Sequence, residues 1–298
     1  MKASYLLLSF SELRDRAEEL REKLESCDLC PLECGVNRLA GEKGRCGSGR
    51  EMVVSSISSH FGEEKPLVGR SGSGTIFLSN CNLECVYCQN YELSQFGRGR
   101  KTTAGEVAEG MLELQSRGCH NVNWVSPTHF APQLVEALVE ARQDGLEIPV
   151  VYNTGGYDSV ETLKLLDGIV DIYMPDMKYS DENNGLRYSG VPNYPEVNRE
   201  GVKEMHDQVG DLKTDAAGIA TAGLLIRHLV LPNGVAGSRK VLEFIRDEIS
   251  EDSYVNVMGQ YRPMWKASES EEIERSVTRE EYRRATELAR ELGLDRGL

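Results

Sequence analysis

The sequence has no apolar run near the roughly 18 residues that a transmembrane helix needs, and it is poor in basic residues. Its 298 residues include 34 Lys and Arg against 48 Asp and Glu, for a formal net charge of −14. Binding to a polyanion needs clustered positive charge, so we expect neither a nucleic-acid partner nor a membrane partner. Residues 1–10 also lack the apolar length and the small-residue cleavage site of a signal peptide. We therefore expect a cytoplasmic protein.

The chain does contain a regular alternation of strand and helix patterns after residue 70. Short apolar runs predict strands at 75–79, 121–126, 148–153, 169–174, 223–231 and 254–258. Helical periodicity and capping patterns predict helices at 103–118, 130–143, 158–166, 195–209, 239–250 and 278–293. Such alternation is typical of a parallel sheet with right-handed crossovers. The unit count predicts an α/β fold, a partial (β/α)6 TIM-like barrel, because a closed eight-fold barrel needs about 250 residues.

The segments around this barrel are expected to be smaller. Before it, we predict a helix at 11–25, a strand at 52–57 and a loop at 62–74. Exposed polar loops are expected at 181–184 and 211–218, and a solvated charge run at 269–274. The predicted organisation is an N-terminal helix with a cysteine-bearing extension (1–70), the barrel (71–266) and a C-terminal helix (267–298).

Seven of the eight cysteines fall into two sets, which in a cytosolic protein indicates metal binding or catalysis rather than disulfides. One set, Cys81, Cys85 and Cys88, follows the first barrel strand. Three thiolates can hold three irons of a [4Fe–4S] cluster and leave the fourth iron open to a substrate or cofactor. A zinc site that borrows a further ligand, or simply reduced thiols, are the alternatives. Active sites of βα barrels lie at the carboxyl ends of the strands, which favours the cluster.

Residues 81–90, Cys-Asn-Leu-Glu-Cys-Val-Tyr-Cys-Gln-Asn, resemble the signature of the radical S-adenosylmethionine (SAM) superfamily. The pattern is most similar to pyruvate formate-lyase activating enzymes, C-x3-C-x-Y-C-H-N, and a wider resemblance to their PflX-type group covers about residues 27–265. The resemblance implies that SAM chelates the open iron and is cleaved reductively to a 5′-deoxyadenosyl radical that abstracts hydrogen.

The same resemblance implies a partner and an electron donor. Activases act on a protein, a glycyl radical enzyme, so a protein or peptide substrate is expected, with ferredoxin or flavodoxin as donor. Two alternatives remain open. The same chemistry could act on another protein or on a small metabolite, or the protein could be a non-catalytic iron–sulfur electron carrier.

Several residues match positions that bind the cofactor in this family. Tyr87 occupies the aromatic position that lies against the adenine, and Asn90 matches, whereas Gln89 replaces the usual His. Met174-Pro-Asp-Met-Lys178 resembles the activases' M-x-D-x-K stretch, which makes Asp176 a polar anchor near the cofactor. Lys178 is then a partner for the SAM carboxylate or for Asp176 itself. An ordinary ion pair between the two is the alternative.

Other strand ends depart from the family pattern. Asn153 replaces Asp in a D-T-N-G turn, which removes a charge, and Ser126 lies where the superfamily usually has G-G-E. Ser126, Thr128 or their backbone carbonyls are our candidates for the missing contact to the methionine amino group. We expect His129 either to face the substrate or to cap the helix predicted at 130–143. We expect one of Arg227 and His228 to point into the barrel, because side chains alternate along a strand. His60, Glu63 and Glu64 are expected to form a solvated acidic turn, and a place at the mouth of the site is the alternative.

The second set, Cys27, Cys30, Cys34 and Cys46, supplies four thiolates, enough for a closed zinc site or an auxiliary iron–sulfur cluster. Both metals remain open, and free thiols are the alternative to a metal site. Because the set precedes the barrel, we expect it to stabilise the fold rather than to relay electrons, with Cys30→Ala lowering stability but leaving SAM cleavage. Cys119 stands alone and is expected to be a small buried side chain.

Overall fold

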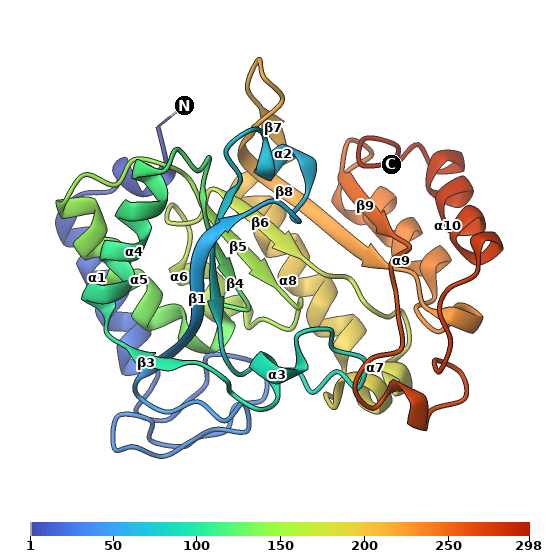
Figure 1. Cartoon of the computed structure of the whole chain (residues 1–298), viewed down its shortest axis with the longest axis horizontal. Helices are drawn as coiled ribbons and strands as arrows, with labels where there is room; N and C mark the ends of the chain where they lie inside the picture. Colours follow the sequence, from blue (N-terminus) through green and yellow to red (C-terminus); the bar gives the residue numbers. More distant parts are fainter. Residues whose placement is uncertain (1) are drawn as a thin grey trace.

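The computed structural model describes residues 2–298 and has an open, mostly parallel sheet at its centre (Figure 1). Its parallel strands are β2 (Ser73–Leu78), β4 (Val122–Val125), β5 (Val150–Thr154), β6 (Ile172–Pro175), β8 (Ala220–Leu229) and β9 (Tyr254–Met258). Each pairs in parallel with the next, and the sheet does not close on itself. The predicted α/β class and partial (β/α)6 barrel are confirmed, with carboxyl ends of the strands gathered at one edge.

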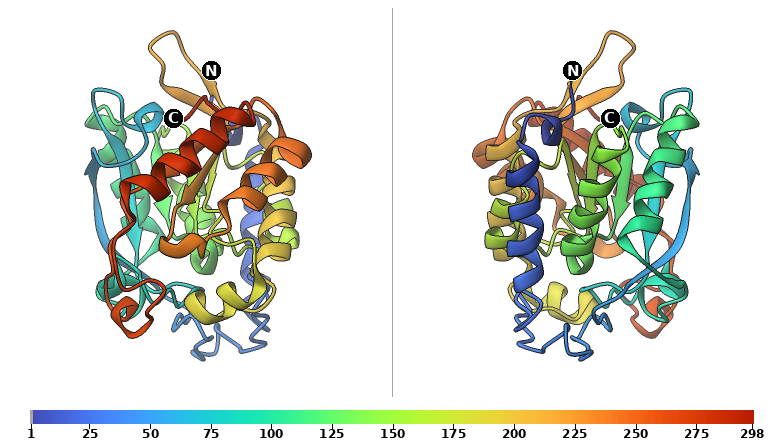
Figure 2. Two further views of the ribbon diagram at one scale, coloured as in Figure 1. Left: turned by 90° about the vertical axis from the view of Figure 1, so that its right-hand side faces the viewer. Right: turned by 90° about the vertical axis from the view of Figure 1, so that its left-hand side faces the viewer.

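Helices cover the outer face of this sheet, as the two side views show (Figure 2). They are α4 (Ala104–Ser116), α5 (Ala131–Gln143), α6 (Val160–Leu165), α8 (Tyr194–Val209), α9 (Ser238–Phe244) and α10 (Arg279–Glu291). The predicted capping boxes are present: Thr103 with Glu106 opens α4, and Thr278 with Glu281 opens α10. None of the helices within residues 2–298 is long and apolar enough to cross a bilayer.

Short elements that lack a clear periodicity escaped the sequence analysis. They are α2 (Lys65–Val68), α3 (Tyr91–Ser94), β3 (Arg100–Thr102), α7 (Glu182–Ser189) and β7 (Lys213–Thr214). The loop predicted at 181–184 is wrong, because Asp181 caps α7 by accepting hydrogen bonds from the backbone N–H groups of Asn183 and Asn184. α7 consists mostly of polar residues and contains one glycine, so no apolar stripe marks it.

The segment before the barrel is joined closely to it. β1 (Met52–His60) pairs antiparallel with β2 and carries β3 on its other side. α1 (Phe10–Glu22) begins at a Ser9–Glu12 capping box, and its Leu13 and Leu20 share the main hydrophobic core with Leu134 of α5. Residues from the 1–70 segment therefore extend the sheet and pack against the outer helices.

The loop predicted at 62–74 enters the barrel instead of lying on its surface. Leu67 of α2 is fully buried in a cluster with Val151 of β5, Ile172 of β6 and Leu225 of β8. Burial of apolar surface against three strands anchors this segment at the amino ends of the strands. As a result, the residues just before α2 point toward the interior of the barrel.

A buried carboxylate at the start of β6 links the N-terminal segment to the sheet and predicts a pH effect. Asp171 accepts hydrogen bonds from the backbone N–H groups of Ser4 and Val150, at 2.6 and 2.8 Å, and from the Ser4 hydroxyl. Burial is the main cause that raises the pKa of Asp171 from its ordinary value of 3.8 to about 6. The folded state therefore binds more protons than the unfolded state between these two values.

We expect Asp171 to contribute about 1 kcal/mol more stability at pH 5 than at pH 7, because stability rises on acidification where the native state binds more protons. Urea unfolding at both pH values, for the wild type and for Asp171→Asn, isolates this term. An identical pH difference in the two proteins would contradict it.

Candidate active site

The three cysteines of the first set line one cavity of about 370 Å³ at the carboxyl ends of the strands. β2 ends at Leu78, and the chain turns through Asn80, whose φ is +69°, directly onto Cys81. The ends of four further parallel strands and α3 complete the wall. Lining residues from these elements include Leu93, Ser126, Asn153, Asp176, Lys178 and Arg227. The structure thus brings most of the predicted site residues together.

Each of the three sulfur atoms has a hydrogen-bonding group beside it. The Leu83 N–H donates to Cys81 Sγ at 3.4 Å, the Ser189 hydroxyl lies 3.0 Å from Cys85 Sγ, and the Ser94 hydroxyl lies 3.1 Å from Cys88 Sγ. Iron–sulfur thiolates accept such hydrogen bonds, which tune the cluster potential. The donor set therefore fits a [4Fe–4S] cluster with three protein ligands.

The charge around these thiols fits the same cofactor. Burial raises the pKa of both Cys81 and Cys85, whereas the nearby Lys178 ammonium acts to lower it. Metal binding removes the thiol proton, and Lys178 then faces a thiolate. Among residues 2–298, no three His, Cys, Asp or Glu side chains have the spacing of a single-ion site. The thiolates of a [4Fe–4S] cluster each bind a different iron.

Asp176 forms the centre of an ion-pair network on the cavity wall. Its carboxylate accepts from Lys178 Nζ at 2.5 Å and from Arg227 Nε at 2.8 Å. Burial acts to raise the pKa of Asp176, but the two cations outweigh it, and the pKa is lowered. Burial likewise acts to lower the pKa of Lys178, and Asp176 outweighs it. All three groups are therefore charged, on side chains no more than 17% exposed.

A glycine turn holds the backbone of Asp176 in place. Gly156, with φ +77°, follows β5, and a Cβ atom there would collide with the Asp176 carbonyl oxygen. That oxygen also accepts hydrogen bonds from the Tyr194 hydroxyl and the Asn198 amide. Only glycine combines this close approach with a left-handed conformation, so the turn after β5 positions the carboxylate that follows β6.

Asn153 connects the network to residues that we expected in a solvated turn. Asn153 Oδ1 accepts from Arg227 Nη2 at 2.8 Å, and its amide donates to Glu63 Oε2 at 3.4 Å. Glu63 also contacts His60 Nδ1 at 3.0 Å. His60 and Glu63 line the cavity. They are held there because α2, which follows them, is buried against the amino ends of the strands. The expectation of a solvated acidic turn at His60, Glu63 and Glu64 is therefore wrong, and the alternative, a place at the mouth of the site, holds for His60 and Glu63.

The remaining predicted cofactor residues divide into two groups. Ser126 and Asn90 line the cavity, and Ser126 adopts φ +57°, a left-handed conformation that is strained for a residue other than glycine. Tyr87 lies outside the lining. It is buried in a second hydrophobic cluster, where its hydroxyl is 2.6 Å from that of Tyr179. Tyr179 in turn contacts Ser189, which links Tyr87 to the sulfur of Cys85 through hydroxyl groups.

The histidines on the strand ends are structural. His129 is buried, its Nε2 lies 2.9 Å from the Ser79 carbonyl, and burial lowers its pKa to about 3. It therefore neither faces the cavity nor carries charge. Arg227 is the inward residue of the β8 pair, whereas His228 is buried outside the cavity, with Nδ1 2.7 Å from the Met177 carbonyl.

The four cysteines of the second set also lie close together. Burial raises the pKa of the Cys30 thiol to about 12, and Cys46, Cys27 and Cys34 act in the same direction because they are near. Cys119 is buried apart from both sets, as expected.

This second set lies close to the first, although it precedes the barrel in the sequence. Asn80 donates to Ser48 Oγ at 3.1 Å, and Arg45 forms an ion pair with Glu84 at 3.4 Å. Figure 1 shows the cysteine-rich segment after α1 at the same end of the molecule as α3. The place of the second set before the barrel in the sequence therefore gives no distance argument against an electron relay.

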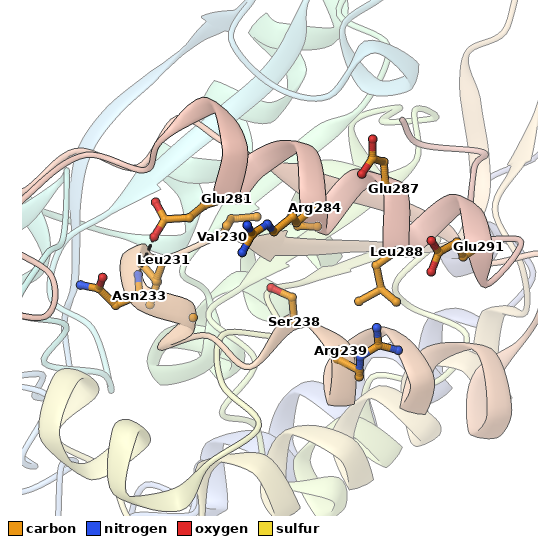
Figure 3. A pocket seen from close by; sticks show the side chains of 12 residues that line it. Val230, Leu231, Asn233, Ser238, Arg239, Glu281, Arg284, Glu287, Leu288 and Glu291 are labelled. Carbon is orange, nitrogen blue, oxygen red and sulfur yellow. Dashed lines mark hydrogen bonds between the residues drawn. The ribbon is translucent and has the colours of Figure 1, made fainter.

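A second cavity, of about 600 Å³, lies between α9 and α10 (Figure 3). Carboxylates and guanidinium groups line it, including Glu281, Arg284, Arg239 and Glu291, and no cysteine does. It lacks the donor set described above, so we place the chemistry in the smaller cavity.

Comparison with known proteins supports this assignment. The radical SAM superfamily model matches residues 75–219, which contain the three cysteines. Uncharacterized protein MJ0674 of Methanocaldococcus jannaschii is 34% identical over 289 residues, covering 94% of this chain and 79% of the relative. Uncharacterized protein MJ0808 of the same organism is 27% identical over 167 residues, which cover 50% of this chain and 48% of that relative.

A solved structure matches the fold. A radical SAM methyltransferase from Sphaerobacter thermophilus superposes with a TM-score of 0.51 at 13% identity, over 74% of this chain and 64% of that one. At this identity the likeness concerns the fold alone. The matching sequence model, the partial barrel and three cysteines at one cavity agree, and the chain belongs to the radical SAM superfamily.

Proposed function

We propose that this protein is a radical SAM oxidoreductase that reductively cleaves SAM and takes a hydrogen atom from a protein or peptide, as activases of glycyl radical enzymes do. The observation that carries the proposal is the shared cavity. Three thiols, a fixed ion-pair network and the ends of five parallel strands meet there.

The residues of this cavity have separable roles. Cys81, Cys85 and Cys88 would hold three irons of a [4Fe–4S] cluster. Lys178 and Arg227 offer cations to the SAM carboxylate, and Asp176 fixes their positions. When bound, the cluster and SAM supply a carbon radical that abstracts hydrogen. Apolar lining from Phe77 and Leu83 would exclude water from that radical.

The size of the cavity supports a large substrate that enters only in part. A volume of about 370 Å³ is near the lower end of the ~300–1,000 Å³ of small-molecule sites. A nucleoside cofactor would occupy most of it. The group that gives up hydrogen would then reach in from outside, as a residue on a protein loop can.

Aromatic side chains beside the cavity support the same substrate class. Tyr91 of α3 stacks on Trp265 with ring centroids 6.3 Å apart, and Phe96 packs against Tyr91 while remaining 58% exposed. Between them, Leu93, Ser94 and Gln95 line the cavity. Exposed aromatic rings are common anchors for protein partners.

The proposal includes ferredoxin or flavodoxin as the electron donor, because cleavage of SAM consumes an electron.

Product analysis tests the proposal. Protein reconstituted with iron and sulfide without oxygen, then mixed with dithionite and SAM, is expected to form 5′-deoxyadenosine. Formation should depend on dithionite and should rise with the protein fraction of a native lysate, not with its small-molecule fraction. A carrier of electrons alone would form no 5′-deoxyadenosine. Stimulation by the small-molecule fraction alone would contradict the protein substrate.

A further inference from the structure

Two cysteines of the second set, Cys34 and Cys46, lie beside a small space at Gly44, and Cys27 and Cys30 are close to them. Gly44 lies beside two of them, and a Cβ atom there would be 3.5 Å from Cys34 Sγ and 3.7 Å from Cys46 Sγ. The Arg45 N–H donates to Cys34 Sγ at 3.4 Å. The backbone of Cys27 is held by the Gly35 N–H, which donates to the Cys27 carbonyl at 3.0 Å. Glycine at position 44 leaves this space free of side-chain atoms.

Next to these thiols lies a buried cation with no carboxylate. Arg38 is 0% exposed. Its Nε and Nη2 donate to the Gly49 carbonyl at 3.0 and 2.8 Å, and its Nη1 points to Cys27 Sγ at 3.8 Å. The ring of Phe130 lies 5.7 Å from the guanidinium carbon. No Asp or Glu in the described part of the chain forms an ion pair with it.

A buried guanidinium without a counter-charge costs several kcal/mol, and arginine does not lose its proton in proteins. One carbonyl oxygen and an aromatic ring do not supply a full negative charge. A [4Fe–4S]²⁺ cluster held by four thiolates does, because the cluster and its four cysteine ligands together have a net charge of about −2. Arg38 is therefore in the position that the counter-ion of such a centre requires.

We infer that Cys27, Cys30, Cys34 and Cys46 hold a second [4Fe–4S] cluster, with Arg38 as its buried counter-ion. A single zinc ion is not the occupant that we infer, because no three His, Cys, Asp or Glu side chains of residues 2–298 have the spacing of a single-ion site. The centre sits against the radical SAM loop. Asn80, which precedes Cys81, donates to Ser48 Oγ, and Gly47 lies against the same Asn80 side chain, since its Cβ would be 3.4 Å from Asn80 Oδ1. A metal bound to Cys46 would therefore hold the adjacent Gly47 and Ser48 in place. These two residues pack against Asn80, which leads into the catalytic cysteine set.

Metal analysis of anaerobically purified, full-length protein tests this inference. Beyond about four irons at the catalytic set, the wild type is expected to contain about four additional irons per chain. Cys30→Ser should lose this additional metal and keep the first four irons. The matched control is Cys119→Ser, which changes a buried cysteine outside both sets and should retain all metal. Wild-type protein with only about four irons, with or without zinc, would overturn the inference, and so would Cys30→Ser with an unchanged metal content.

Two further measurements remain decisive if Cys30→Ser is insoluble. In the folded wild type, Cys27, Cys30, Cys34 and Cys46 should resist alkylation until a chelator removes the metal, as read by mass spectrometry. Arg38→Gln should release the metal at a chelator concentration at least about tenfold lower than the wild type, since a charge-assisted contact of 1.4 kcal/mol corresponds to tenfold. Arg38→Lys should restore part of this resistance. Alkylation without a chelator, or an unchanged release in Arg38→Gln, argues against the centre.

Discussion

Cys85→Ala is expected to abolish cleavage of SAM, leaving 5′-deoxyadenosine at the level of an assay without enzyme. Each thiolate of the set binds a different iron, so loss of one leaves an iron without its protein ligand. Cys85 is also the most buried of the three, and water cannot easily replace its sulfur. The brown visible absorbance of the reconstituted cluster should be lost together with activity, which separates cluster loss from a defect in substrate binding.

Cys119→Ala is the matched control for this experiment. Cys119 is buried and its sulfur lies 3.1 Å from the Ser59 hydroxyl, remote from the cavity lining. Its loss is expected to cost about 1 kcal/mol of stability with full cluster absorbance and cleavage. If Cys85→Ala still cleaved SAM, the assignment of the catalytic cluster to this set would be wrong.

Asp176→Ala is expected to destabilise the fold by about 3–5 kcal/mol and to weaken SAM binding. Removal of the carboxylate leaves the Arg227 and Lys178 cations buried side by side without their shared partner, which is the costly way to break a buried ion pair. Urea unfolding measures the first effect and the SAM dissociation constant the second. The cluster spectrum should be unchanged, because the three thiols remain.

Two comparisons make this result specific. Asp207→Ala removes an exposed carboxylate on α8 and should change stability by no more than about 0.5 kcal/mol. Asp176→Ala combined with Arg227→Met removes one stranded cation and should recover part of the lost stability. If Asp176→Ala had the stability and the SAM affinity of the wild type, this prediction would be wrong. Asp176 and Lys178 would then form an ordinary ion pair of the loop, without a role in SAM binding.

The sequence alone determined the features that depend on neighbours in the chain. Alternating apolar runs and helical stripes depend on periods of 2 and 3.6 residues, so the parallel sheet and partial barrel were predictable. The capping boxes at Thr103 and Thr278 span four residues each and were recognisable for the same reason. The cluster motif occupies residues 81–88, and its spacing alone identified the three thiols and the strand that presents them.

Contacts between distant parts of the chain were decided only in three dimensions. Glu63 contacts Asn153 across 90 positions, and Ser189 contacts Cys85 across 104. Which of Arg227 and His228 faces inward depends on the register of β8 against β6, which no local pattern specifies.

The burial of Arg38 beside Cys27 illustrates the same limit, because a charged residue in a glycine-rich segment is expected to be solvated. Local periodicity determines where strands and helices form, since its cause lies in the geometry of adjacent residues. The partner of a buried charge is decided by tertiary packing, since that partner is whichever group the completed fold brings within a few ångströms and shields from water.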